Sequence, residues 1–106
     1  MALEITNDNF KTEIKDSKKP TILKVYADWC GPCKQLEPIF EEISNEQGDK
    51  YTFAKLNVDN AREASIDLGV SSIPTMIFIK DGDVVGRETG YMPKEDLVAK
   101  ITEYLG

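Results

Sequence analysis

Cys30 and Cys33 are the residues of this chain whose type and spacing could do chemistry. They are its two cysteines, and only Gly31 and Pro32 separate them. Two thiols at this spacing can exchange electrons with another disulfide, or they can supply ligands to a metal. In the redox case, one thiolate attacks a substrate disulfide and the second thiol then displaces the product.

Two alternatives to redox chemistry fit this pair poorly. A structural disulfide would close a loop of about four residues and stabilise by roughly 2 kcal/mol, against about 3 for a loop of fifteen. A structural zinc ion needs about four ligands. The chain offers one thiol pair and no histidine, so only a dimer that shares its cysteines would complete a zinc site.

The elements on either side of the pair are a strand and a helix. Residues 21–27 form an apolar, β-branched run that is typical of a buried strand. An apolar stripe at helical spacing begins in the motif and consists of Cys33, Leu36, Phe40 and Ile43. Pro32 suits a first helical turn. Cys30 then stands exposed at the helix N-terminus, where free N–H groups and the helix dipole favour a charged sulfur, and Cys33 is shielded one turn behind it.

The other segments alternate between strand and helix patterns and predict an α/β fold. Before residue 21, we expect a strand at 3–5 and then a helix with caps at 6–8 and with Phe10 and Ile14 on one face. After the motif helix, we expect a strand at 51–58 and a short helix capped by Asn60 and ending at Gly69. The rest of the chain predicts a strand at 75–79 inside the sheet, a hairpin turn at 81–82, a strand at 84–88 and a last helix opened by Pro93.

The motif Trp-Cys-Gly-Pro-Cys-Lys at residues 29–34 resembles the active site of the thioredoxin family. The resemblance extends to 55–59, 69–75, Asp81-Gly82 and Gly90, and so covers nearly the whole chain. It implies a central mixed five-stranded sheet flanked by four helices, in the order βαβαβαββα. It also implies a protein-disulfide reductase that carries electrons through a reversible Cys30–Cys33 disulfide and maintains cell redox homeostasis.

The same resemblance assigns roles to residues around the pair. We expect Gly31 to let a substrate backbone approach, and Pro32 to stiffen the ring that the disulfide closes. A cis peptide bond is implied before Pro74. A shallow apolar patch is implied to meet the substrate, and it consists of Trp29, Ile73, Pro74 and Gly90.

Lys24 departs from the family pattern, because most thioredoxins carry a buried acid six positions before the first cysteine. Lys55, which the family keeps, is implied to lie beside it. Three hypotheses stay open: a neutral Lys24 amine accepts the proton of Cys33, a charged Lys24 favours the thiolate through space, or Lys24 reaches solvent and has no effect. We expect the nearby carboxylates of Asp28 and Glu37 to face solvent.

Length and charge limit the remaining possibilities. We expect one domain over residues 1–106. The chain has 13 basic and 19 acidic residues and a net charge of −6, which argues against nucleic acid as a partner. We expect no signal peptide or membrane span, and we expect a cytoplasmic monomer. By resemblance it binds no cofactor or metal itself, and its partners are disulfide-containing proteins and a thioredoxin reductase, a flavoenzyme that draws on NADPH.

Two rival functions remain. The chain could be a disulfide oxidase or isomerase, although the Gly-Pro dipeptide and the C-terminal Tyr-Leu-Gly, which is no retention signal for the endoplasmic reticulum, argue against it. It could also be a non-catalytic thioredoxin that serves as a binding subunit of a larger complex. The redox potential distinguishes the first rival, and the effect of losing Cys30 distinguishes the second.

Overall fold

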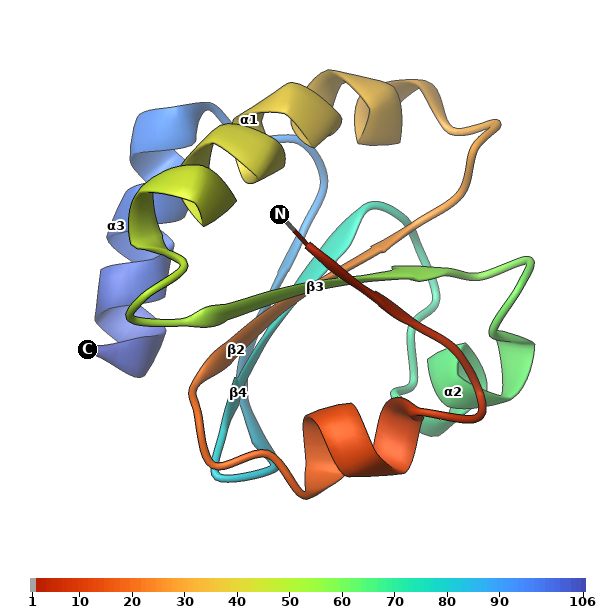
Figure 1. Cartoon of the computed structure of the whole chain (residues 1–106). Coiled ribbons are helices and arrows are strands. Elements are labelled where there is room, and N and C mark those ends of the chain that lie inside the picture. The colour runs from red at the N-terminus through yellow and green to blue at the C-terminus, as the bar shows by residue number, and fades with distance from the viewer. Residues whose placement is uncertain (1) are drawn as a thin grey trace.

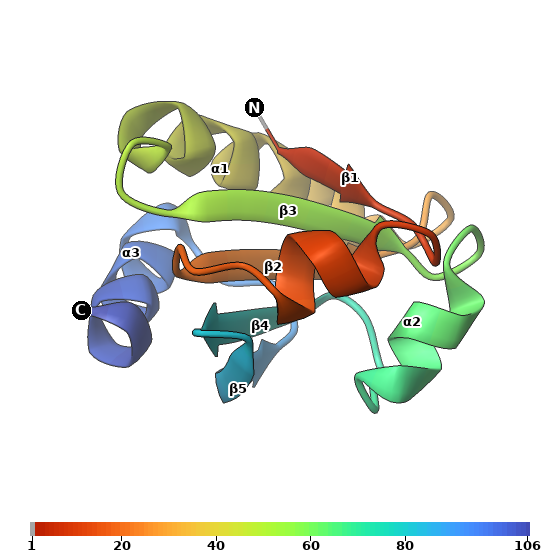
Figure 2. The ribbon, with the colours of Figure 1, turned by 60° about the horizontal axis from the view of Figure 1, so that its bottom comes forward.

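The computed structural model describes residues 2–106 and shows a β-sheet with helices on both faces (Figures 1 and 2). Its elements in chain order are β1 (Leu3–Ile5), a short helix η1 (Lys11–Lys15), β2 (Thr21–Tyr26), α1 (Gly31–Gln47), β3 (Thr52–Asn57), α2 (Arg62–Asp67), β4 (Thr75–Lys80), β5 (Asp83–Thr89) and α3 (Lys94–Leu105). The predicted order of strands and helices is therefore confirmed.

The sheet is mixed and has five strands in the order β1-β3-β2-β4-β5. β1 and β2 both run parallel to β3, whereas β4 runs antiparallel to β2 and to β5. This arrangement confirms the predicted thioredoxin fold. It places β2 at the centre of the sheet, and the loop after β2 leads directly into α1, so the cysteine motif begins where the central strand ends.

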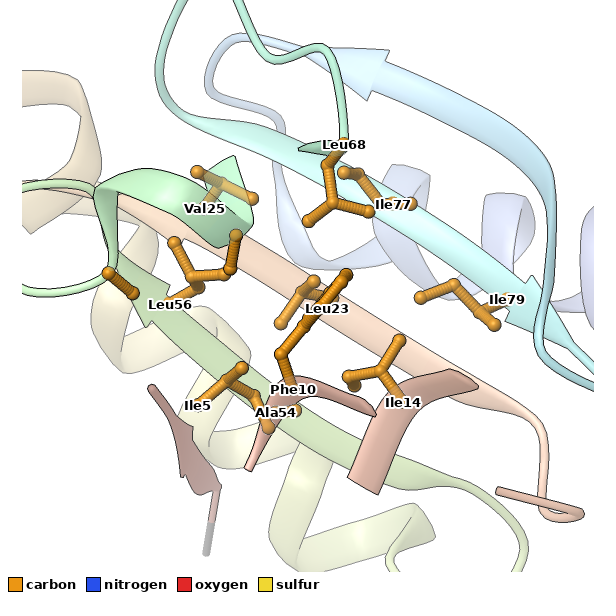
Figure 3. Packing of buried hydrophobic residues seen from close by; sticks show 12 residues of the cluster. Ile5, Phe10, Ile14, Leu23, Val25, Ala54, Leu56, Leu68, Ile77 and Ile79 are labelled. Carbon is orange, nitrogen blue, oxygen red and sulfur yellow. The ribbon is translucent and has the colours of Figure 1, made fainter. Parts of the chain in front are cut away.

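Each face of the sheet carries its own hydrophobic core. On one face, η1 and α2 cover a cluster built largely from branched aliphatic side chains of the strands, including Leu23 and Val25 of β2 (Figure 3). On the other face, α1 and α3 cover a cluster that includes Ile22 of β2. Because successive strand residues point to opposite faces, Lys24 lies on the same face as Ile22, beneath α1.

Backbone positions with positive φ confirm two predicted turns. Asp81 and Gly82 have φ values of 54° and 82° and connect β4 to β5 as a tight hairpin. Gly69 has φ 71° just after α2, as expected for a glycine that ends a helix. Gly82 also lies against Lys15, where a β-carbon would overlap the carbonyl oxygen.

The predicted N-terminal helix is present, whereas one detail of α2 is wrong. Phe10 and Ile14 are both buried, Ile14 in η1 and Phe10 directly before it. The Asp16 N–H of this helix bonds the carbonyl of Lys11, five residues back, so its turn is wider than an α-helical one. Asn60 does not cap α2, because the residue before the helix is Ala61 and its side chain offers no cap. The side chain of Asn7 instead accepts a hydrogen bond from Ala64 N–H at 3.0 Å, and so supplies a cap from another segment.

Within residues 2–106, no helix is long and apolar enough to cross a membrane.

Candidate active site

The two cysteines lie at the N-terminus of α1 and are joined by a disulfide, with their Cα atoms 5.2 Å apart. Cys30 is the residue before the first helical turn, with φ −88° and ψ 116°. Its sulfur accepts a hydrogen bond from the backbone N–H of Cys33 at 3.3 Å. The prediction that Cys30 sits at the helix N-terminus is confirmed, and its sulfur faces a backbone donor there.

The expected difference in exposure between the cysteines is wrong for the oxidised protein. Cys30 is 6% exposed and Cys33 is 2% exposed. Both pack with Ala27 in a small cluster that Tyr26 and Ile73 adjoin. Both cysteines therefore pack among apolar neighbours when the disulfide is formed.

Gly31 and Pro32 form the exposed edge of this first turn. A β-carbon at Gly31 would meet no atom within 4 Å, so the surface over the disulfide is open there. Open space at this edge is consistent with the expected approach of a substrate backbone.

Trp29 is 69% exposed and lies beside the disulfide in the sequence. Its indole Nε1 donates a hydrogen bond to Oδ2 of Asp59 at 2.9 Å, which fixes the ring at the surface. The sequence analysis missed Asp59, because thirty residues separate the two partners and no local pattern connects them.

The other residues of the expected patch come from the loops around β4 and β5. The peptide bond between Ile73 and Pro74 is cis, as the resemblance implied. Gly90, with φ 97°, donates its N–H to the carbonyl of Pro74 at 2.8 Å, so the two loops are tied together. Tyr91, which the sequence analysis did not single out, follows Gly90 and is 46% exposed.

Lys24 has no exposed surface, so the hypothesis that it reaches solvent is wrong. Its ammonium lies 5.0 Å from the ring centroid of Tyr26 and 5.0 Å from that of Phe40. It donates a hydrogen bond to Oε2 of Glu37, which lies in the second turn of α1, one turn after Cys33. Aromatic faces and a carboxylate all suit a cation, so the buried Lys24 side chain lies in surroundings that favour a positive charge.

Glu37 connects both lysines of the site. Its Oε1 lies 3.9 Å from the ammonium of Lys55, which pairs in register with Lys24 on the neighbouring strand. The expectation that Glu37 faces solvent is therefore only partly confirmed: its side chain keeps 41% of its surface exposed, but its carboxylate is bonded to Lys24. Asp28 is exposed, as expected. Sequence reasoning could have found Glu37 from its spacing of four residues from Cys33, which places both on one face of the helix.

Tyr26 borders the same region. Burial, followed by the charges of Glu4 and Asp28, raises the pKa of Tyr26 to about 12. Its phenol therefore stays protonated across the range in which thiols ionise.

Comparison with known proteins identifies relatives over nearly the full chain. The sequence model of the Thioredoxin family matches residues 1–103. A thioredoxin of Chlorobaculum thiosulfatiphilum is 43% identical over 97% of this chain and 95% of its own length. A thioredoxin of Mycolicibacterium smegmatis is 44% identical over 95% of this chain and 92% of its own length. The thioredoxin of Bacillus subtilis is 38% identical over 97% of both chains.

Proposed function

The chain belongs to the thioredoxin family, and on that premise we propose that Cys30 is its attacking thiolate and Cys33 is the thiol that resolves the mixed disulfide. The protein is a thiol-disulfide oxidoreductase that reduces protein disulfides. The observation that carries the assignment of roles is the position of Cys30 before the first turn of α1, with its sulfur facing the N–H of Cys33. A thiolate at that position gains from the helix dipole and from the backbone donor.

Four residues around the disulfide are proposed to bind the substrate. Trp29, Ile73, Pro74 and Gly90 come from three loops. A shared surface beside the sulfurs is supported by the exposure of Trp29, by the packing of Ile73 against the cysteines and by the hydrogen bond between the Pro74 and Gly90 loops, although Pro74 itself is buried. An apolar patch of this kind holds an unfolded or extended substrate segment while its disulfide meets Cys30.

Members of this family act with disulfide-containing proteins and with a reductase. We propose that the reductase for this chain is an NADPH-linked flavoenzyme, and that the chain works as a monomer. The proposed compartment is the cytoplasm, because a dithiol that acts as a reductant needs a compartment that keeps thiols reduced.

The assignment of roles is tested with two serine variants and insulin as a protein disulfide. Reduced Cys33→Ser should form a stable mixed disulfide with insulin, visible as a mass adduct under non-reducing conditions, because no second thiol can resolve it. Cys30→Ser should form no such adduct at neutral pH. An adduct on Cys30→Ser and none on Cys33→Ser would reverse the two roles.

A further inference from the structure

Glu37 is the carboxylate that shares a helix face and a pocket with Cys33. It follows Cys33 by four residues on α1, which places the two side chains on one face, one turn apart. Both line a pocket of about 510 Å³, together with Tyr26, Ala27, Asp28 and Lys34. The pocket gives the Cys33 thiol and the Glu37 carboxylate a common space at the end of β2.

Two lysine side chains of the sheet, one from β2 and one from β3, fix the position of the Glu37 carboxylate. Lys24 is buried and donates to one carboxylate oxygen, and Lys55 lies 3.9 Å from the other. Rotation of the side chain away from the pocket would leave the Lys24 ammonium buried without its carboxylate partner, which is strongly unfavourable. A glutamate that would otherwise sample solvent is thereby held beside Cys33.

Other groups that face this pocket are weaker candidates to accept a proton from Cys33. Nζ of Lys24 donates to Oε2 of Glu37 and Nζ of Lys55 lies 3.9 Å from Oε1, so the Glu37 carboxylate itself engages both amino groups, while Lys34 is exposed. The phenol of Tyr26 keeps its proton, because burial raises its pKa to about 12. Asp28 remains, but it is exposed, and within residues 2–106 no ion pair holds its carboxylate in place.

We propose that the Glu37 carboxylate accepts the proton of the Cys33 thiol when the mixed disulfide is resolved, with Lys24 and Lys55 as positioning residues. This inference rests on the proposed roles of Cys30 and Cys33. The position at which most of the family carries a buried acid holds Lys24 here, and the salt bridge to α1 brings an acid to the site from the helix instead of from the strand.

The proposed step conserves protons and electrons. In the mixed disulfide, Cys30 is bonded to a substrate sulfur and Cys33 is a thiol. Glu37 takes the thiol proton, and the electron pair left on the Cys33 sulfur forms a bond to the sulfur of Cys30. The bond from Cys30 to the substrate breaks, and the substrate leaves as a thiolate that is then protonated from the Glu37 carboxyl or from solvent. The chain is oxidised to its disulfide, and the substrate disulfide is reduced to two thiols.

The experiment follows both steps with one reagent, dithiobis-nitrobenzoate. Each half of this aromatic disulfide is coloured when released as a thiolate. Attack by Cys30 releases the first half at a rate that depends on reagent concentration, and resolution by Cys33 releases the second at a rate that does not. Wild type, Glu37→Gln and Asp28→Asn are compared by stopped flow from about pH 6 to about pH 9, a range that spans thiol ionisation.

We expect Glu37→Gln to slow the second phase about tenfold at pH 7 and to leave the first phase within about twofold of wild type. The deficit should shrink to about twofold by pH 9, because an ordinary thiol ionises unaided near pH 8.5. Asp28→Asn should leave both phases unchanged. A second phase that is unaffected by Glu37→Gln, that falls equally at all pH values, or that falls with Asp28→Asn instead would overturn the proposal.

Failure of the proposed dithiol exchange by Cys30 and Cys33 would give a different result, since wild type would then release no second half of dithiobis-nitrobenzoate at all. If Glu37→Gln does not fold, the double variant Lys24→Met/Glu37→Gln removes the buried cation along with the acid. Its second phase must show the same deficit at pH 7 and the same recovery at high pH. A pH-independent deficit in this variant would also overturn the proposal.

Discussion

Lys24, which is entirely buried in the sheet, donates a hydrogen bond to Oε2 of Glu37 on the helix that carries both cysteines. The two residues are unequal partners, because the Glu37 side chain keeps 41% of its surface exposed. Loss of the carboxylate leaves an uncompensated buried charge, whereas loss of the lysine leaves an acid that water can solvate.

This asymmetry predicts that the two single substitutions lower the free energy of unfolding by unequal amounts. Glu37→Ala should lower the free energy of unfolding by about 2–3 kcal/mol, somewhat less than for a fully buried pair, and Lys24→Met should change it by less than about 1 kcal/mol. Urea unfolding of the oxidised protein measures both. Glu46→Ala is the matched control on α1, because Lys94 keeps Glu42 as its second partner. A larger cost for Lys24→Met than for Glu37→Ala would contradict the account.

The hydrogen bond from Trp29 to Asp59 predicts a defect confined to large substrates. Asp59→Ala should slow the reduction of insulin about fivefold, the effect of losing about 1 kcal/mol, because the exposed indole is no longer held in place. Reduction of dithiobis-nitrobenzoate, which is too small to need the patch, should change by less than about twofold. Asp49→Ala, at the far end of α1, is the control. Equal slowing with both substrates would argue that Asp59 acts on the cysteines and not on docking.

Tyr26 predicts a pH dependence of stability in the alkaline range. Its pKa is raised to about 12 in the folded protein, by burial first and by Glu4 and Asp28 after that, whereas an unfolded tyrosine ionises near 10. The folded state therefore holds its proton more tightly, and the contribution is fully present below about pH 10 and is lost as the pH rises towards about 12. Tyr26→Phe should show a smaller fall in unfolding free energy than wild type over this interval. Parallel curves for the two proteins would refute the assignment.

Two glycines predict contrasting effects of the same substitution. Gly82→Ala should cost about 3 kcal/mol, because φ is 82° and the added β-carbon would overlap the carbonyl oxygen of Lys15. Gly31→Ala should change stability by less than about 0.5 kcal/mol, because its β-carbon meets nothing. Thermal unfolding of the two variants side by side tests this. A destabilised Gly31→Ala protein would show that the start of α1 is packed more tightly than the structure indicates.

Local patterns in the sequence were sufficient for most of the fold. The β-branched run at 21–27, the hairpin turn at 81–82 and the spacing of the cysteines each depend on residues close together in the chain, and each was predicted correctly. The caps of α2 could not be predicted in this way, because Asn7 reaches Ala64 across 57 residues.

The charged part of the site was the least predictable. A glutamate in the second turn of an amphipathic helix is typical of a solvated face, and a lysine in a strand usually extends to water. The spacing of Glu37 from Cys33 places the two on one face of α1, but the pairing of Glu37 with Lys24 depends on how α1 lies across β2, and no local pattern encodes that pairing. The ion pair between Lys24 and Glu37 is therefore a product of tertiary packing, as is the bond between Trp29 and Asp59.

The redox equilibrium of the Cys30–Cys33 pair against a glutathione or dithiothreitol buffer tests the central claim most directly. A protein-disulfide reductase should have a potential near the value known for thioredoxins, about −270 mV. A potential of about −180 mV or higher, as in disulfide isomerases and oxidases, would contradict the reductase function and favour an oxidase or isomerase.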